Sequence, residues 1–303
     1  MVNSIQHHDA TGMARDVSRM VRGSETSDGA GVRLRRYIAS PELDMLDPFL
    51  LLDAFRSDDP EDYIAGFPPH PHRGFETVTY LLHGRMRHKD SARHEGVIES
   101  GGVQWMTAGR GIEHSEMPEQ EQGLLYGFQL WVNLPAELKM SPPRYQEFNA
   151  AAIPEEYRDD GITVRVIAGR TANGVEGAVR DISARATYLD VSVPAEQVFE
   201  QAVEQNHAAF IFVIEGALEV LGEARKVAVP AESLAVLGGG DRIRLRATSD
   251  TRLLLIAGQP FREPVARYGP FVMNSEQEII QAFEDYRNGD FSGYRATEVT
   301  HDA

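Results

Sequence analysis

The sequence predicts an all-β protein of the sandwich or barrel type. Two observations lead to this fold class. The chain holds many short runs rich in β-branched and aromatic residues, each bounded by Gly, Pro, Asn or Asp, as is typical of β-strands. These runs are not separated by the helical patterns that a parallel α/β fold requires. The expected strands cover residues 77–82, 103–106, 128–132, 163–167, 210–214, 218–221 and 253–256.

The chain divides into two halves that resemble each other weakly. A polar stretch with three prolines, LPAELKMSPPRYQEF (134–148), lies between them and predicts a boundary. On either side, YLLHGRM (80–86) and FVIEGAL (212–218) are each a strand-like run that ends in a Gly turn. We therefore expect an N-terminal domain of residues 1–143 and a C-terminal domain of residues 144–303.

One helix is clearly indicated near the C-terminus. Ser275 and Glu278 have the spacing of a capping box, which satisfies free N–H groups at a helix start. Ile279, Ile280, Phe283 and Tyr286 then recur at helical spacing, and Asn288-Gly289 ends the run. We expect a short helix that packs on the β-structure.

The composition excludes several classes of protein. Of the 303 residues, 42% are hydrophobic and 25% are charged, as in ordinary globular proteins. A net charge of −16 argues against direct binding to nucleic acid or to anionic membranes. The chain has no cysteine, which excludes disulfides, thiolate metal sites and a Cys nucleophile.

The sequence gives no sign of a membrane or export segment. The longest apolar runs, FIFVI (210–214) and LLLIA (253–257), are far shorter than a membrane-spanning helix. Residues 1–16 lack the basic and then apolar pattern of a signal peptide. We expect a cytoplasmic protein, and a monomer.

Two short pairs of metal-binding residue types are the strongest functional signal. They are His70-x-His72 and His114-x-Glu116. Residues two apart point the same way on a strand, whereas on a helix they would lie roughly 200° apart. On neighbouring strands the pairs could converge on one divalent ion such as Fe, Mn, Ni, Co or Zn.

The other histidines are more simply explained. His83, His88 and His94 lie in a polar, turn-rich stretch, and we expect surface histidines or hydrogen-bonded core histidines there. If Gly84 is placed over Gly216, Ala202 and Glu204 stand where His70 and His72 do, and Arg246 stands in place of His114. The second half therefore lacks an equivalent site, and we expect His207 to lie on the polar surface.

The sequences around both pairs resemble a known family. They read GFPPHPHRGFETVTYLLHG (66–84) and GVQWMTAGRGIEHSE (102–116), which are similar to the two sequence boxes of the cupin superfamily. Together with GFQLWVNLP (127–135) and the C-terminal GPFVMNSEQEIIQAFEDYRNGDF (269–291), they resemble the pirin family. Arg93 stands where that family often has Gly.

The resemblance implies a bicupin, which consists of two facing antiparallel β-barrels of the jelly-roll type. It implies one metal ion, Fe(II), in the N-terminal barrel only, with Mn, Ni, Co and Zn as alternatives. The ligands would be His70, His72, His114 and Glu116. Typical cupins take the carboxylate from the first box, which makes Glu76 the rival of Glu116. By strand parity alone Glu76 shares a face with His70 and His72, so parity leaves both open.

Two functions follow from the resemblance as expectations. The first is quercetin 2,3-dioxygenase activity, with a flavonol and O2 as substrates and Glu116 as ligand and catalytic base. The second is a regulatory protein that binds a transcription factor or a metabolic enzyme without turnover. Another metal-dependent reaction, such as an isomerisation, stays open. The aromatic and apolar neighbours are expected to be barrel core or, alternatively, the wall of a dry pocket for a flat ligand; they are Phe75, Trp105, Met106 and Phe128.

Overall fold

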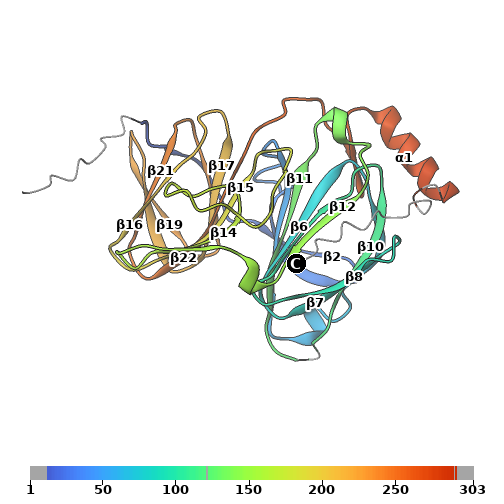
Figure 1. The fold of residues 1–303 in the computed structure, drawn as a ribbon, viewed down its shortest axis with the longest axis horizontal. Coiled ribbons are helices and arrows are strands. Elements are labelled where there is room, and N and C mark those ends of the chain that lie inside the picture. Colours follow the sequence, from blue (N-terminus) through green and yellow to red (C-terminus); the bar gives the residue numbers. More distant parts are fainter. Residues whose placement is uncertain (1–11, 121, 290, 292–303) are drawn as a thin grey trace, which may run out of the picture.

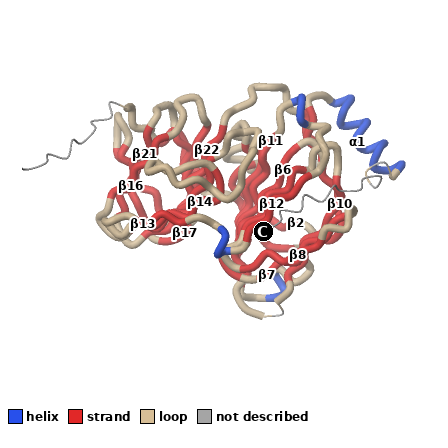
Figure 2. Tube along the Cα trace, in the orientation of Figure 1, coloured by secondary structure: helices blue, strands red, loops and turns tan. Residues whose placement is uncertain are grey.

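The computed structural model describes residues 12–120, 122–289 and 291. The expectation that residues 1–16 are not a signal peptide therefore concerns a segment that lies mostly outside the described residues. Within these ranges the chain folds into two β-barrels that lie side by side (Figure 1). Strands dominate both barrels, and one α-helix lies at the outer edge of the first (Figure 2). The predicted all-β bicupin class is confirmed.

The first barrel combines a seven-stranded and a four-stranded antiparallel sheet. The larger sheet has the order β12 (Arg144–Phe148), β9 (Val103–Thr107), β6 (Phe75–His83), β11 (Leu125–Asn133), β4 (Phe49–Ser57), β3 (Val32–Ile38) and β2 (Ser24–Asp28). The smaller sheet has the order β5 (Phe67–His72), β10 (Ile112–Pro118), β7 (Arg85–Asp90) and β8 (Glu95–Glu99).

The second barrel repeats this design. Its seven-stranded sheet has the order β1 (Val17–Val21), β20 (Ser233–Leu237), β17 (Ala208–Glu215), β22 (Thr251–Gly258), β15 (Thr187–Val193), β14 (Thr163–Ala168) and β13 (Glu155–Tyr157). Its four-stranded sheet has the order β16 (Val198–Ala202), β21 (Arg242–Ala247), β18 (Ala217–Leu221) and β19 (Lys226–Pro230).

The two halves exchange strands across the expected boundary at residue 143. The N-terminal strand β1 pairs with β20 of the second barrel. Strand β12, which follows the boundary, pairs with β9 of the first barrel. The boundary at residue 143 stays a prediction, but the barrels are joined by more than a linker.

The largest apolar core lies between the two seven-stranded sheets. Phe128 of the first barrel meets Phe212 of the second with ring centroids 5.2 Å apart. The Tyr80 hydroxyl donates a hydrogen bond to Asp190 Oδ2 at 2.6 Å across the same interface. Because large aromatic side chains dominate burial energies, this interface ties the two barrels firmly together.

After β22 the chain returns to the first barrel, crossing above it in Figure 1. It forms a two-stranded ribbon, β23 (Ala266–Tyr268) and β24 (Phe271–Met273), and then the helix α1 (Glu276–Asn288). The Ser275 side chain accepts a hydrogen bond from the Glu278 N–H, and Gly289 caps the other end at φ 81°. Both predicted helix ends are confirmed.

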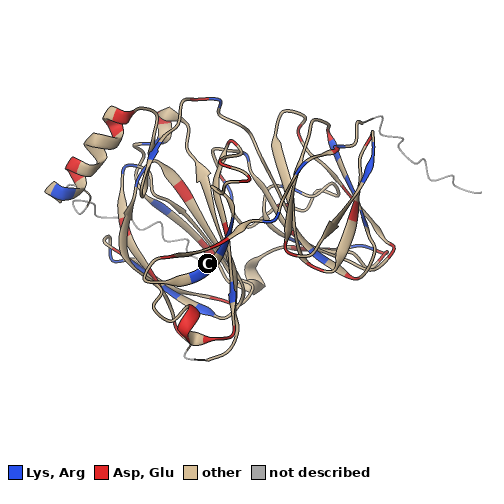
Figure 3. Ribbon diagram, turned by 180° about the vertical axis from the view of Figure 1, so that it is seen from behind, with Lys and Arg blue, Asp and Glu red and all other residues tan. Residues whose placement is uncertain are grey.

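The helix covers part of the first barrel but not with every predicted apolar residue. Ile279 is buried, whereas Ile280 is 56% exposed. Its first turn is acidic and its last turn contains Arg287, as the colours in Figure 3 show. That arrangement complements the helix dipole. Over the rest of the molecule acidic and basic segments are interspersed (Figure 3).

Three short 3-10 helices complete the described structure: Pro60–Asp62, Ala136–Leu138 and Ala150–Ala152. No helix within the described ranges has the length and apolar character needed to cross a bilayer.

Candidate metal centre

Three of the predicted ligands meet on two adjacent strands of the four-stranded sheet. Strands β5 and β10 pair antiparallel, and His114 lies directly opposite His70 in their register. Directly opposite residues of an antiparallel pair share a face, and His72 shares the face of His70 by its spacing of two. The register shifts between His114 and Glu116, so Glu116 follows a local irregularity.

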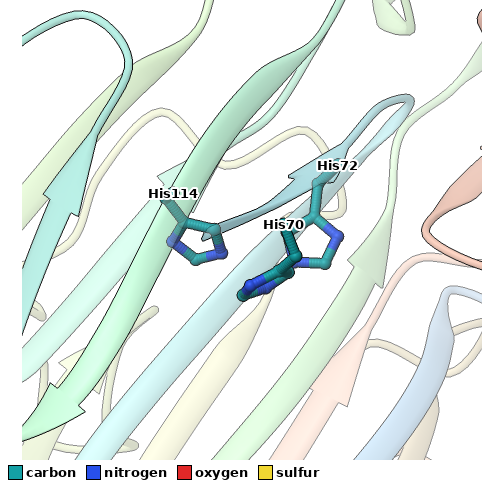
Figure 4. A group of neighbouring side chains, drawn as sticks. All are labelled: His70, His72 and His114. Atoms are coloured by element: carbon teal, nitrogen blue, oxygen red, sulfur yellow. The ribbon is translucent and has the colours of Figure 1, made fainter. Parts of the chain in front are cut away.

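The three imidazoles point toward a common centre (Figure 4). One donor nitrogen from each lies within 4.8 Å of the other two. The Nε2 atoms of His70 and His72 are 3.0 Å apart. Two nitrogens about 2.1 Å from one metal are about 3.0 Å apart when their bonds meet at a right angle. His70 Nε2 and His72 Nε2 therefore already have the separation of two nitrogen ligands on one ion.

The protonation states also fit a metal. The pKa values of His72 and His114 are lowered well below the usual histidine range, first by burial and then by neighbouring imidazoles. Both rings are neutral near pH 7 and keep a lone pair for a metal. His70 Nδ1 lies 2.8 Å from the Pro68 carbonyl. A carbonyl only accepts, so Nδ1 carries the proton and the His70 Nε2 lone pair faces the centre.

Unpartnered buried nitrogens lead to the same conclusion. Both ring nitrogens of His114 are buried without a hydrogen-bond partner. Native proteins rarely leave buried polar atoms unsatisfied unless an ion or water is missing. The residues present therefore fit a divalent metal.

Glu116 lies in the same cavity and has its own hydrogen-bond network. It is 2% exposed. The Thr79 hydroxyl lies 2.7 Å from Glu116 Oε1, and the Gln129 amide donates to Glu116 Oε2 at 3.0 Å. Among the described residues the donors within 4.8 Å of one another at this centre are the three imidazoles alone. Sequence reasoning missed Thr79 and Gln129, which are polar residues within the mostly buried strands β6 and β11.

Glu76 lies on a different face from the one that parity indicated. The turn at Gly74 separates β5 from β6, so alternation does not carry over from His72 to Glu76. On β6, Glu76 shares a face with Val78 and Tyr80, which belong to the core between the barrels. Burial raises the Glu76 pKa, although Thr107 donates to Oε1 at 2.8 Å.

A cavity of about 720 Å³ opens beside the imidazoles. Such a volume is typical of small-molecule sites. His70, His72, Glu116 and Trp131 line it, together with apolar side chains that include Leu34, Leu51, Phe55 and Phe67.

Three of the four expected aromatic and apolar neighbours lie elsewhere. Phe75 contacts both His72 and Trp131, with ring centroids 5.1 Å and 4.3 Å away. Trp105 and Phe128 instead face the second barrel. Met106 packs in a small cluster with Ala108 and Ile112. The flat wall of the cavity is Trp131, which sequence reasoning did not single out.

Comparison with known proteins agrees with this fold. The model of the family described as Pirin matches residues 31–132, and that described as Pirin C-terminal cupin domain matches residues 188–292. A pirin-like protein of Caulobacter vibrioides is 54% identical over 277 residues, which cover 91% of this chain and 99% of that protein. The chain belongs to the pirin family.

Other similar proteins have names that mention an activity or a metal. A Pseudomonas aeruginosa protein with the provisional name quercetin 2,3-dioxygenase is 48% identical, over 91% of this chain and 97% of that one. The crystal structure of a quercetin 2,3-dioxygenase from Acinetobacter baumannii has a TM-score of 0.84 at 34% identity and covers 93% of this chain and 100% of that one. An Escherichia coli pirin in complex with nickel(II) shares the fold, with a TM-score of 0.63 at 18% identity, over 80% and 99% of the two chains.

This pirin-family chain contains a second histidine cluster, which has a different geometry. His88, His94 and Glu147 also place donor atoms within 4.8 Å of one another. However, the His88 and His94 rings are stacked at 21°, and His94 stacks on Tyr145 at 14°. Lone pairs lie in the ring plane, so stacked rings direct them past each other rather than at one ion. His88 Nε2 instead lies 2.6 Å from Glu147 Oε2.

The remaining histidines differ partly from expectation. His83 is exposed, as predicted. His88 lies on strand β7 and is buried, with Nε2 2.6 Å from Glu147 Oε2, which agrees with the expected core alternative. His207 is 6% exposed, so its expected surface position is wrong; its backbone carbonyl accepts a hydrogen bond from the buried Arg15.

Proposed function

We propose that this protein is a metal-dependent dioxygenase that opens flavonols, of the quercetin 2,3-dioxygenase type. The observation that carries the proposal is the cavity beside the three converging imidazoles, which has the flat ring of Trp131 in its wall. A regulatory site needs no room for a substrate, whereas a flavonol needs a flat-walled cavity of this size. The names of the Pseudomonas and Acinetobacter relatives support the same substrate class.

The metal would be held by His70, His72, His114 and Glu116, with Fe(II) as the proposed ion and Mn, Ni, Co or Zn as alternatives. Four protein ligands leave one or two coordination positions open, unlike a closed structural zinc site. Three neutral imidazoles and one carboxylate leave a divalent ion with a net charge of +1. When bound, the metal would supply the Lewis acidity and redox chemistry that couple a flavonol to O2.

The protein's own residues would orient the flavonol and move one proton. Glu116 Oε would accept the proton of the flavonol 3-hydroxyl. Thr79 and Gln129 hold that carboxylate in place. Phe75 packs behind Trp131, and Trp131 would support the flat ring system and exclude water.

The test is turnover of quercetin by protein loaded separately with Fe, Mn, Co or Ni. We expect one O2 consumed per CO released, at a rate well above that of the free metal, and loss of both in His72→Ala. A rate no higher than that of the free ion with every metal would contradict the proposal. It would favour the alternative, a metal- or redox-dependent regulator, which a pulldown with ferrous and ferric protein would test.

A further inference from the structure

Arg267 stands at the rim of the cavity and belongs to β23, the segment that returns from the second barrel. It lines the cavity together with the adjacent Gly269 and Pro270. Its guanidinium carbon lies 5.2 Å from the centroid of Trp131. The Trp131 ring in turn lies 5.2 Å from the His72 ring. Trp131 therefore links the arginine to the imidazole centre along one wall.

Two contacts hold the Arg267 guanidinium in position and leave most of its donors free. Nη1 donates to the Leu50 carbonyl at 3.0 Å, and the face of the group lies over Trp131. A guanidinium has five N–H donors in a fixed fork. Within the described part of the chain, no carboxylate lies within ion-pair distance of Arg267; Asp44, Asp53 and Asp28 act on it only at longer range.

The other arginine of the cavity is already satisfied. Arg36 donates to both carboxylate oxygens of Asp53, at 2.8 Å and 2.7 Å, and to Asp28 at 2.8 Å. These bonds raise its pKa above the usual range and neutralise its charge locally. Arg267 is therefore the group that can offer a paired donor edge to a ligand in this cavity.

We propose that Arg267 is the binding residue for a second, ionised oxygen of the ligand, on the side of Trp131 away from His72 along the same cavity wall. The ligand class is a flat conjugated molecule with one oxygen at the metal centre and an ionised phenol or carboxylate at its far end. Trp131 supports the ring system between the two. The inference rests on the proposed function, which places the first ligand oxygen at the metal centre. It adds that the second oxygen carries a negative charge, which Arg267 binds.

The test compares matched ligands by calorimetry on Ni(II)-loaded protein without O2, so that no turnover is needed. The probes are 3-hydroxyflavone and its 4′-carboxylate. We expect the carboxylate probe to bind wild-type protein about 10-fold more tightly than the neutral one. Arg267→Gln should weaken the carboxylate probe about 10- to 100-fold, as for a hydrogen-bonded charge, and the neutral probe less than about 3-fold. Arg267→Lys should fall between, because a lysine keeps the charge but not the fork.

Arg287→Gln on the exposed face of α1 is the matched control, and it should change neither affinity. Bound nickel, measured by mass spectrometry, should be unchanged in all variants. Equal loss of both probes, or no loss, in Arg267→Gln would overturn the inference. If wild-type protein binds neither flavonol, the flavonol proposal fails. The Arg267 subsite is then tested with 2-naphthoate, a flat carboxylate that is not a flavonol. If wild-type protein and Arg267→Gln bind 2-naphthoate equally well, the role of Arg267 is overturned.

Discussion

Replacing Glu116 with glutamine should separate metal binding from folding. Glu116, Thr79 and Gln129 form a closed triangle of contacts. Thr79 Oγ1 lies 2.7 Å from Glu116 Oε1 and 2.7 Å from Gln129 Oε1, and Gln129 Nε2 lies 3.0 Å from Glu116 Oε2.

The number of protons in this triangle predicts the effect on stability. With an ionised carboxylate, the hydroxyl and one amide N–H supply two protons for three contacts, whichever way the Gln129 amide is turned. An amide at position 116 supplies the missing third proton and removes a buried charge. A buried hydrogen bond contributes about 1 kcal/mol. Metal-free Glu116→Gln should therefore be as stable as wild type or about 1 kcal/mol more stable.

The effect on metal affinity should be opposite and larger. Residues that only support a ligand change metal affinity about 10- to 100-fold when mutated. If Glu116 binds the metal directly, Glu116→Gln should exceed that range, which means a loss of more than about 2.7 kcal/mol. Glu76→Gln is the matched control, because it makes the same chemical change at a buried glutamate of β6 that shares a face with the core between the barrels. It should lose no more than about 100-fold in metal affinity.

Competition with a coloured chelator would measure both affinities, and calorimetric unfolding of metal-free protein would measure stability. The reasoning about the site would be refuted if Glu116→Gln bound metal as tightly as wild type while Glu76→Gln lost more than about 100-fold. A large loss of metal-free stability in Glu116→Gln would refute the proton count.

Three further predictions concern stability. Because His72 and His114 stay neutral when folded but take up protons when unfolded, metal-free protein should lose up to roughly 2–3 kcal/mol between pH 7.5 and pH 5.5; a flat pH profile in urea unfolding would contradict the lowered pKa values. Arg93 has φ 71°, so Arg93→Gly should raise the free energy of unfolding, measured in urea, by about 1 kcal/mol, whereas a decrease would mean that its side chain matters more than its backbone. The buried Lys139 Nζ donates to Gly74 O, Asn133 Oδ1 and Val272 O, so Lys139→Met should cost about 3 kcal/mol or more by leaving these acceptors unpaired, and unchanged thermal unfolding would argue against that role.

The elements that the sequence predicted well are those in which local pattern and burial agree. The run TVTYLL lies in β6. The helix begins after the Ser275 cap and ends at Gly289, as the sequence predicted. His70 and His72 share a face because they are two residues apart on one strand, and His114 joins them because its strand pairs with theirs.

The elements that were missed depend on longer-range structure or on polar residues that face inward. β7 reads RMRHKD, and its buried positions are Met86, His88 and Asp90, so a strand alternation was present but did not look apolar. The face of Glu76 was misjudged because a turn at Gly74 resets the alternation. No local pattern could reveal that Arg267, almost 200 residues from His72 in the chain, lines the same cavity.

The pairing of β1 with β20 has a consequence for how the protein is made. Residues Val17–Val21 emerge early from the ribosome, but their partner strand, Ser233–Leu237, is more than 200 residues away. At about 5–20 residues per second, the first strand waits roughly 10–40 s for its partner. The cavity wall at Gly269 and Pro270 is synthesised later still. The cavity beside the imidazoles is therefore completed only near the end of translation, after its histidines have long left the ribosome.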